Sequence, residues 1–221
     1  MPPQTQTVFR LTSRNGFDGL QAFKEPIPTI GDYEVLVKIR SVSINYRDIA
    51  IAHDKYPLMV KDQVIPCSDM AGEVVGVSSQ VEDIFIGDNI VAPISSSALY
   101  GPVKEDRNTL GGGKDGVLRE YIVLPAHTVI KLPKSPHTFS EWAALVGTGT
   151  TIWNCFYGYV PLKPGQTVLI QGMNDRPEKR TATYNRRHGR RCLDRSHLRK
   201  SCWCDHDSYV VKRRKARESE G

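Results

Sequence analysis

The stretch YEVLVKIRSVSI, residues 33–44, alternates apolar and polar side chains. Val35 and Val37 would point to one side of an extended chain, while Lys38 and Arg40 would point to the other. Successive side chains of a β-strand face opposite sides of the sheet, so this period of two predicts a strand with one buried face. The stretch therefore favours a fold built mainly from β-sheet.

Four later segments repeat this β-rich character between turn residues. Glycine, proline and aspartate punctuate the chain around them, as in Ile86-Gly87-Asp88. Short strands separated by such turns are typical of a compact barrel or sandwich. The segments are GEVVGV at 72–77, DNIVAPI at 88–94, LREYIVL at 118–124 and HTVIKLP at 127–133.

Helical signals begin at Thr138. Ser140 is a candidate N-cap, and Glu141 suits the first turn of a helix. Helix, turn and a β-branched strand ending at glycine are how a parallel α/β domain begins. The order after this helix is a small-residue stretch at 147–151, a second helical segment at 152–159, and a strand at 167–171 that ends at Gly172.

Composition narrows the class of protein. No apolar run reaches the ~18 residues that a membrane-spanning helix needs, and the N-terminus lacks the apolar stretch of a secretory signal. The 5 cysteines are irregularly spaced and do not suggest a disulfide framework. We therefore expect an intracellular, cytoplasmic protein.

Charge divides the chain at Gly172. Residues 1–172 carry 15 Lys and Arg against 17 Asp and Glu, whereas residues 173–221 carry 15 against 7. The two parts therefore require separate interpretations.

Five motifs follow one another within residues 8–172. They are SVSINYRDIAI (41–51), VIPCSDMAGEVVGV (64–77), IGDNIVAP (86–93), DGVLREYIVLP (115–125) and LKPGQTVLIQG (162–172). In this order they closely resemble the medium-chain dehydrogenase/reductases, which include zinc-type alcohol dehydrogenases and quinone oxidoreductases. The resemblance implies a mainly β fold: a GroES-like, partly open β-barrel over 1–137, and the start of an α/β Rossmann domain over 138–172. Residues 173–221 would form a basic tail that is disordered or translated out of phase.

The resemblance also bears on a catalytic metal. In zinc-dependent members a cysteine stands at the position of Asn45, a histidine–glutamate pair at Ser68-Asp69, and a later cysteine near Thr148. Zinc is held by thiolate, imidazole and carboxylate groups, so Asn and Ser are poor ligands and Asp69 alone cannot hold the ion. The segment 93–115, where a structural-zinc lobe would fall, contains no cysteine. We therefore expect a zinc-independent protein with no metal site.

Without zinc, hydride transfer depends on an acceptor that is polarised by hydrogen bonds. The resemblance implies that Tyr46 and Asn45 line the cleft for nicotinamide and substrate, and that Thr151 and Gly172 contact the cofactor. The alternative is structural: Asn45 as a turn former, Tyr46 as a half-buried packing residue, and Thr151 as a hydroxyl on a helix surface.

Other reactive side chains have simpler interpretations. Cys67 is expected to be a small buried residue rather than a nucleophile. Arg47 and Asp48 could pair near the cleft, but exposed charges are the expectation. His53, His127 and His137 have no spaced partner that indicates a triad or a metal site.

The phosphate-binding loop of a Rossmann domain does not follow Gly172. That loop needs further glycines within a few residues, yet Met173, Asn174 and Asp175 come next, followed by a basic run. One interpretation of 173–221 is functional: a basic arm that binds nucleic acid through its phosphates, or a zinc site of Cys192, Cys202, Cys204 and His206, whose spacing matches no standard zinc finger. Another is an unstructured tail with too few apolar residues to fold.

A third interpretation is that the tail is translated out of phase. Shifting the codons of residues 190–214 by one nucleotide permits GGVSIAHICAKAAGATMTVTSSSDEK, which reads as a glycine turn, a helix and a strand. Residues 173–189 would then be inserted material. On this hypothesis the chain as written binds its cofactor weakly or not at all and has little or no activity.

The function expected from the resemblance is a zinc-independent, NAD(P)H-dependent oxidoreductase that transfers a hydride to a carbonyl or a conjugated enone. NADP is implied by the family alone, and the substrate would be a small carbonyl compound, quinone or enone. The alternative is a GroES-like binding protein whose basic arm contacts nucleic acid or another partner. We expect no membrane partner, nucleic acid only through the tail, and no homodimer, because family members dimerise through the Rossmann sheet edge.

Overall fold

The computed structural model describes residues 4–95, 108–159, 161–164, 167–170 and 180–183. They belong to two compact units, Met1–Thr150 and Thr151–Gly221. None of the helices in this described part combines the length and apolarity that a membrane crossing requires. The division into domains after residue 137, proposed from the sequence, stays a prediction.

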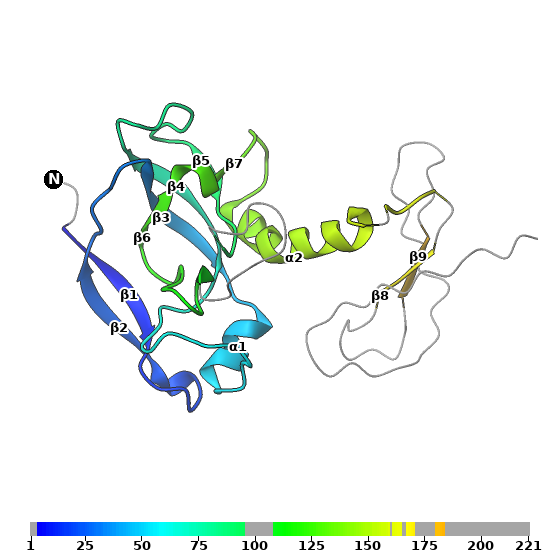
Figure 1. Cartoon of the computed structure of the whole chain (residues 1–221), viewed down its shortest axis with the longest axis horizontal. Coiled ribbons are helices and arrows are strands. Elements are labelled where there is room, and N and C mark those ends of the chain that lie inside the picture. Colours follow the sequence, from blue (N-terminus) through cyan, green and yellow to red (C-terminus); the bar gives the residue numbers. More distant parts are fainter. Residues whose placement is uncertain (1–3, 96–107, 160, 165–166, 171–179, 184–221) are drawn as a thin grey trace, which may run out of the picture. The chain divides into compact units, whose positions relative to one another are not determined.

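A five-stranded antiparallel sheet forms the frame of the first unit (Figure 1). The strand order is β6-β3-β4-β5-β7, so β6 lies beside β3 although some 80 residues separate them in the chain. Each strand falls in or next to a segment that the sequence predicted as β. The strands are β3 (Glu34–Ser43), β4 (Asp69–Val77), β5 (Asn89–Val91), β6 (Tyr121–Pro125) and β7 (Ile130–Lys131), with a short 3-10 turn, η3 (Ala126–Thr128), before β7.

The main core lies on the face of the sheet that the alternation of β3 predicted. Val35 and Val37 are fully buried, and Val37 pairs across the strands with buried Val74. Ile90 of β5 and Ile122 of β6 complete the centre of the cluster. Burying one such side chain stabilises a fold by about 1.5–3 kcal/mol. The sheet is therefore held chiefly by this apolar face.

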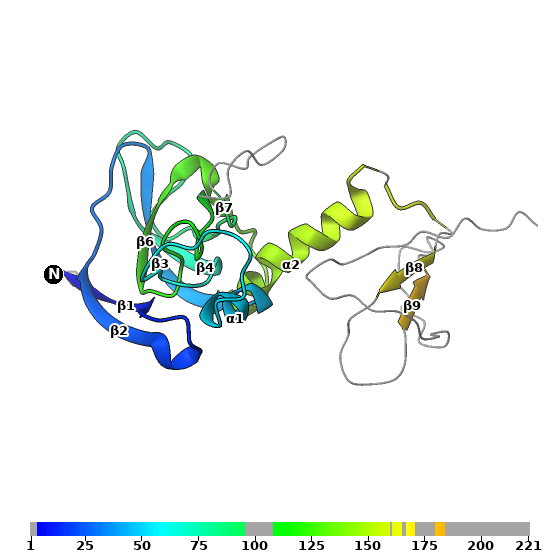
Figure 2. The same cartoon turned by 60° about the horizontal axis from the view of Figure 1, so that its bottom comes forward.

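A two-stranded ribbon, which the sequence analysis did not predict, stands beside the sheet (Figure 2). It consists of β1 (Thr5–Leu11) and β2 (Leu20–Pro26), joined through the short 3-10 turn η1 (Phe17–Gly19). The Phe9 N–H donates to the Leu118 carbonyl at 3.0 Å, and the Tyr121 N–H donates to buried Gln6 at 2.8 Å. These bonds attach the ribbon to the chain that enters β6.

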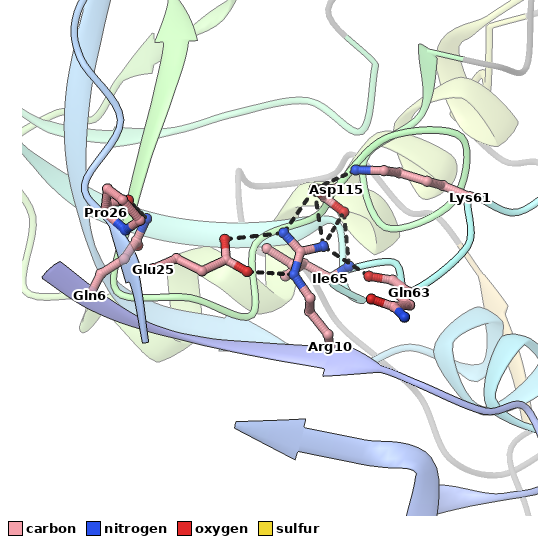
Figure 3. Close-up of polar contacts among 8 residues, drawn as sticks. All are labelled: Gln6, Arg10, Glu25, Pro26, Lys61, Gln63, Ile65 and Asp115. Carbon is pink, nitrogen blue, oxygen red and sulfur yellow. Dashed lines mark hydrogen bonds and ion pairs between the residues drawn. The ribbon is translucent and has the colours of Figure 1, made fainter. Parts of the chain in front are cut away.

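Charged side chains tie the ribbon to two loops (Figure 3). Arg10 Nε lies 2.6 Å from Glu25 Oε1, and Arg10 Nη1 lies 3.2 Å from Asp115 Oδ1. Asp115 also pairs with Lys61 Nζ at 2.6 Å and accepts a hydrogen bond from the Ile65 N–H at 3.1 Å. Segments distant in the sequence are thus joined at one carboxylate.

Helix α1 (Tyr46–Ala52) closes a second, smaller core. Its Ile51 and Ala52 pack with Leu11 of the ribbon and with Val64. The Gly16 N–H donates to the Ala52 carbonyl at 2.9 Å, so the helix end is fixed to the turn of the ribbon.

Helix α2 (Phe139–Tyr157) is continuous through residues 147–151, so the expected break there was wrong. The Glu141 N–H donates to the hydroxyl of Thr138, and the Thr138 N–H donates to Glu141 Oε2 at 2.8 Å. This reciprocal pair is a capping box. The cap is therefore Thr138 and not Ser140, as the sequence analysis expected. Within the first unit, α2 packs through Ala143 on strands β4 and β5.

The second unit contains a short antiparallel pair of strands. Strand β8 (Thr167–Ile170) lies where the sequence predicted a strand, and it pairs with β9 (Arg180–Thr183). The sequence analysis predicted no element at β9. The tail that contains β9 was expected to be disordered or translated out of phase, and no neighbour of β8 was predicted within it. A parallel neighbour would need a crossover of a dozen residues or more, and only 171–179 lie between the two strands.

Candidate active site

The candidate site is built around Asn45, which is the N-cap of α1 and has an extended backbone. Its N–H donates to Asp48 Oδ2 at 2.8 Å, which is how an acidic residue in a first helical turn satisfies a free backbone donor. Its side-chain Nδ2 donates to Asp69 Oδ2 at 3.0 Å. Asn45 therefore starts the helix and also joins it to the first residue of β4.

Asp69 is a buried carboxylate, 1% exposed, that accepts three hydrogen bonds. Besides Asn45, the Ser68 hydroxyl donates to Oδ1 at 2.8 Å, and the Gly147 N–H of α2 donates to Oδ2 at 2.9 Å. The positions that the resemblance matched to zinc ligands thus do meet in space. Sequence reasoning missed this role, although an aspartate inside the apolar run IPCSDMAGEVV is a signal that a carboxylate is buried.

Asp48 is buried, 8% exposed, so the expectation of an exposed charge was wrong. Its Oδ1 accepts a hydrogen bond from the Cys67 N–H at 3.2 Å. Burial raises the pKa of Asp48, and the hydrogen bonds from Asn45 and Cys67 together with the charge of Arg47 only partly oppose this. The Asp48 carboxylate accepts hydrogen bonds from backbone N–H groups of two separate segments, so we assign it a structural role.

Cys67 is 2% exposed, which confirms the prediction of a small buried residue. Burial raises the pKa of its thiol far above the ordinary range, and the nearby carboxylates of Asp48 and Asp69 raise it further. Only the thiolate is a good nucleophile. Cys67 is therefore unreactive in this environment.

Arg47 is only partly exposed and does not form the pair with Asp48 that was considered. Its Nη1 donates to the Leu110 carbonyl at 2.8 Å, and its Nη2 donates to Thr109 Oγ1 at 3.2 Å. The guanidinium carbon also lies 5.2 Å from the centre of the Tyr56 ring. The side chain thus anchors the loop that carries the triple glycine, residues 111–113.

The other predicted site residues are Tyr46, Thr151 and Gly172. Tyr46 follows Asn45 in the chain and is 63% exposed, which leaves its ring accessible to a small molecule. Thr151 is exposed on α2 and belongs to the second unit. Gly172 lies outside the described residues.

The residues at the zinc-ligand positions do not suit a metal ion. Asn45 and Ser68 both act as hydrogen-bond donors toward Asp69, and a neutral carboxamide and a neutral hydroxyl are poor ligands for zinc. Zinc requires several thiolate, imidazole or carboxylate ligands around one centre. In the described part of the chain, no three His, Cys, Asp or Glu side chains gather closely enough to hold a metal ion.

Comparison with known proteins identifies the fold family. Residues 31–134 match the family described as alcohol dehydrogenase GroES-like domain. A zinc-type alcohol dehydrogenase-like protein of Schizosaccharomyces pombe is 37% identical over 163 residues, which are 72% of this chain and 47% of that protein. The chain belongs to the medium-chain dehydrogenase/reductase superfamily. The resemblance inferred from the five motifs is therefore confirmed.

Two further superfamily members show how much of the chain the likeness covers. A trans-enoyl reductase of Emericella nidulans is 27% identical over 173 residues, 75% of this chain and 45% of that protein. A crystal structure from Sinorhizobium meliloti 1021, described as that of a candidate alcohol dehydrogenase, superposes with a TM-score of 0.67 at 29% identity. It covers 75% of this chain and 50% of its own. This chain thus spans about half the length of the superfamily members it matches.

Proposed function

We propose that the first unit of this chain is the catalytic domain of a zinc-independent, NAD(P)H-dependent oxidoreductase. The reaction is the transfer of a hydride to a carbonyl or to an alkene conjugated with one, such as an enone or a quinone. Superfamily membership supports the oxidoreductase class, and the match to a trans-enoyl reductase supports an enone acceptor. These comparisons favour the oxidoreductase over the GroES-like binding protein with a basic arm.

One observation carries the zinc-independent form of the proposal. The side chains at the family's ligand positions are joined to one another: Asn45 and Ser68 donate to Asp69. A carboxylate that already accepts three hydrogen bonds, out of about four lone-pair sites, is poorly placed to bind a cation as well. Acceptor activation must then come from hydrogen bonds. Tyr46, exposed at the start of α1, is the side chain that we assign to this role.

The second unit, in the part described, does not fit the phosphate site of a dinucleotide. That site needs a strand, a glycine-rich turn and a helix N-terminus, followed by a parallel strand. Here β8 has the antiparallel neighbour β9. We therefore assign the chemistry of acceptor activation to the first unit only, and propose that the chain as written binds NADPH weakly. Its cytoplasmic location and the absence of a homodimer also stay predictions.

A chimaera tests the reaction class. Residues 1–166 of this chain are joined to the remaining half of the Schizosaccharomyces pombe relative, which supplies a complete cofactor domain. The chimaera is assayed for NADPH and NADH oxidation with aldehydes, enones and quinones, in the presence of EDTA and then with added zinc. We expect acceptor-dependent turnover that EDTA does not reduce.

Two outcomes would contradict this proposal. Turnover that appears only with zinc would show that the first unit is a zinc-dependent catalytic domain. A folded chimaera that binds NADPH but reduces none of the acceptors would show that the first unit does not carry this chemistry. The parent relative, treated in the same way, is the control for the cofactor domain.

A further inference from the structure

We propose that Asp69 is a positioning residue whose carboxylate holds α1 and α2 on the barrel by hydrogen bonds, at the place where zinc-dependent superfamily members bind a metal ion. The inference deepens the proposed function and rests on it only for the role of the site in catalysis. The role in positioning rests on the geometry of the first unit. On this proposal, one buried carboxylate links α1, α2 and the start of β4.

The three donors to Asp69 come from separate parts of the chain. Asn45 lies at the start of α1, Ser68 directly precedes β4, and Gly147 lies within α2. Asn45 and Gly147 both donate to the same atom, Oδ2, at 3.0 Å and 2.9 Å. One oxygen therefore connects the two helices, as a bound cation would connect two ligands.

The site leaves no room for a larger residue on α2. A Cβ atom at Gly147 would lie 2.6 Å from Asp69 Oδ2 and 3.3 Å from both the Cγ and the Oδ1 of the same side chain. Carbon and oxygen atoms do not approach to 2.6 Å without displacement of one of them. The glycine thus permits the helix backbone to reach the carboxylate, which supports a specific contact rather than incidental proximity.

The electrostatics also single out these three donors. Asp69 is almost fully buried, and no ion pair joins it to a Lys or Arg among the residues that the structure describes. A buried carboxylate is costly unless hydrogen bonds satisfy it, and charge-assisted hydrogen bonds are about twice as strong as neutral ones. The buried carboxylate therefore depends on the hydrogen bonds from Asn45, Ser68 and Gly147. The same three bonds hold these residues in place. Because Tyr46 follows Asn45, the same bond fixes the start of the helix that presents the Tyr46 ring.

Amide hydrogen exchange of two glycines in α2 tests the proposal. The 221-residue protein is labelled with [15N]glycine, and the Gly147 and Gly149 signals are followed in 1H–15N spectra. In Asp69→Asn, the neutral carboxamide no longer offers a charged acceptor to either helix, even where its oxygen takes the place of Oδ2. We expect the protection of Gly147 relative to Gly149 to fall by roughly 10-fold or more, as loss of a hydrogen bond to a charged group predicts.

Gly149 separates positioning from general stability. It lies two residues farther along the helix, and of the described residues only Leu145 lies near the position that its Cβ would take. A merely destabilised fold would lower the protection of both glycines together. Ser68→Ala is the matched variant, because it removes a hydrogen bond to Oδ1 and leaves the Oδ2 pair intact. We expect the Gly147 to Gly149 ratio to stay within roughly twofold in Ser68→Ala.

A second variant covers the case in which Asp69→Asn does not fold. Asn45→Ser keeps a good N-cap residue but removes the amide donor. Gly147 then has Oδ2 to itself, so its amide proton should move downfield while that of Gly149 stays in place. An unchanged Gly147 signal in Asn45→Ser, or equal loss of protection at both glycines in Asp69→Asn, overturns the proposal.

Zinc titration completes the test and is independent of turnover. The proposal expects no shift of the Gly147 signal when zinc chloride is added to the wild type, even if the cysteines of 173–221 bind the ion. A zinc-dependent shift of Gly147 that Asp69→Asn abolishes would show a metal site and overturn the inference. Because these readouts need no cofactor, a failure of the proposed hydride transfer would leave their result unchanged.

Discussion

At the scale of single residues, Asp115 shows how one carboxylate connects parts of the first unit. Its carboxylate accepts hydrogen bonds from the side chains of Lys61 and Arg10 and from the Ile65 N–H (Figure 3). Burial alone would raise its pKa, but the hydrogen bonds from Lys61 and Ile65 and the charge of Arg10 outweigh this, and the pKa is lowered. The ionised form is therefore the one that the fold stabilises.

We predict that Asp115→Asn lowers the free energy of unfolding at pH 7 by about 1.5–3 kcal/mol, the range for hydrogen bonds to charged groups. A carboxylate with a depressed pKa contributes stability that is present above its unfolded pKa near 4 and is lost as the pH falls through the folded value. The difference from wild type should thus shrink on acidification. Urea unfolding from pH 7 to pH 3 measures it.

The control for Asp115 is another acidic residue with a weak partner. Asp54 lies 3.4 Å from Arg14 and is 72% exposed. Exposed pairs contribute little, so Asp54→Asn should change the stability by no more than about 0.5 kcal/mol. A loss at Asp54 equal to that at Asp115 would refute the special role of the network.

Tyr46 is the residue on which the proposed chemistry depends. We predict that Tyr46→Phe in the chimaera lowers kcat/KM by roughly 100-fold, which is typical for removing one hydrogen-bond donor to a developing oxyanion. Its thermal stability should not change, because the ring is 63% exposed. Tyr33→Phe is the matched control, as Tyr33 is 61% exposed on a turn. Equal turnover in both variants would remove Tyr46 from the mechanism.

The roles of single residues were only partly predictable from the sequence. The burial of Cys67 could be predicted, because small apolar side chains are buried by default. The burial of Asp48 and the hydrogen-bond partners of Asp69 could not be predicted, since they depend on backbone donors of Cys67 and Gly147, which lie far away in the chain. Local patterns report side-chain hydrophobicity and do not report which distant N–H groups need an acceptor.

At the scale of elements, α1 depends on an acidic residue in its first turn. Asp48 accepts from the N–H groups of Asn45 and Cys67. We predict that Asp48→Ala lowers the stability by about 1–3 kcal/mol, since it leaves buried donors without an acceptor. Helix α1, as the weakest element without this cap, should lose amide protection first.

The pH dependence at Asp48 should have the opposite sign to that at Asp115. Burial raises the pKa of Asp48, so its contribution is fully present below the unfolded pKa near 4 and is lost as the pH rises through the higher folded value. The stability difference between wild type and Asp48→Ala should therefore be largest in acid. Urea unfolding of both variants on one pH series checks this, and a parallel trend for the two residues would contradict it.

Helices and strands could be predicted from the sequence where the pattern that specifies them lies within a few neighbouring residues. The alternation of residues 33–44 predicted β3 almost to its ends, because one face of that strand is apolar. Strands β1 and β2 were missed, since buried Gln6 occupies an inward position and hides the period of two. Helix α2 was predicted in two pieces because small residues at 147–151 resemble a break, whereas Gly147 is required by the approach to Asp69.

At the scale of the whole molecule, the two units differ in how completely they match the superfamily. The first unit contains the five-stranded sheet and the ribbon, and its residues 31–134 match the GroES-like domain. In the second unit, β8 and β9 pair antiparallel, and the basic residues are concentrated after Gly172. We therefore expect the first unit to carry the activation of the acceptor, whereas binding of the cofactor would depend on the second unit.

The whole-molecule prediction concerns NADPH. The residues after Gly172 are Met173, Asn174 and Asp175, so the expected glycines are absent and Asp175 adds a negative charge to the segment. We predict a Kd of roughly 1 mM or weaker, a binding free energy of about −4 kcal/mol. Nicotinamide fluorescence and calorimetry measure it, with the chimaera as the positive control.

The basic charge of 173–221 provides a competing source of apparent binding, and salt separates the two. Attraction of phosphates to a basic chain weakens steeply as salt rises, whereas a built cofactor site retains specificity for the nicotinamide half. We therefore expect the 221-residue chain to bind NADPH and ADP-ribose equally weakly at low salt, and neither at high salt. Micromolar binding of NADPH that persists at high salt and exceeds that of ADP-ribose would show that residues 167–221 build a cofactor site after all. The oxidoreductase would then be complete within this chain, and zinc-independent turnover should be measurable without the chimaera.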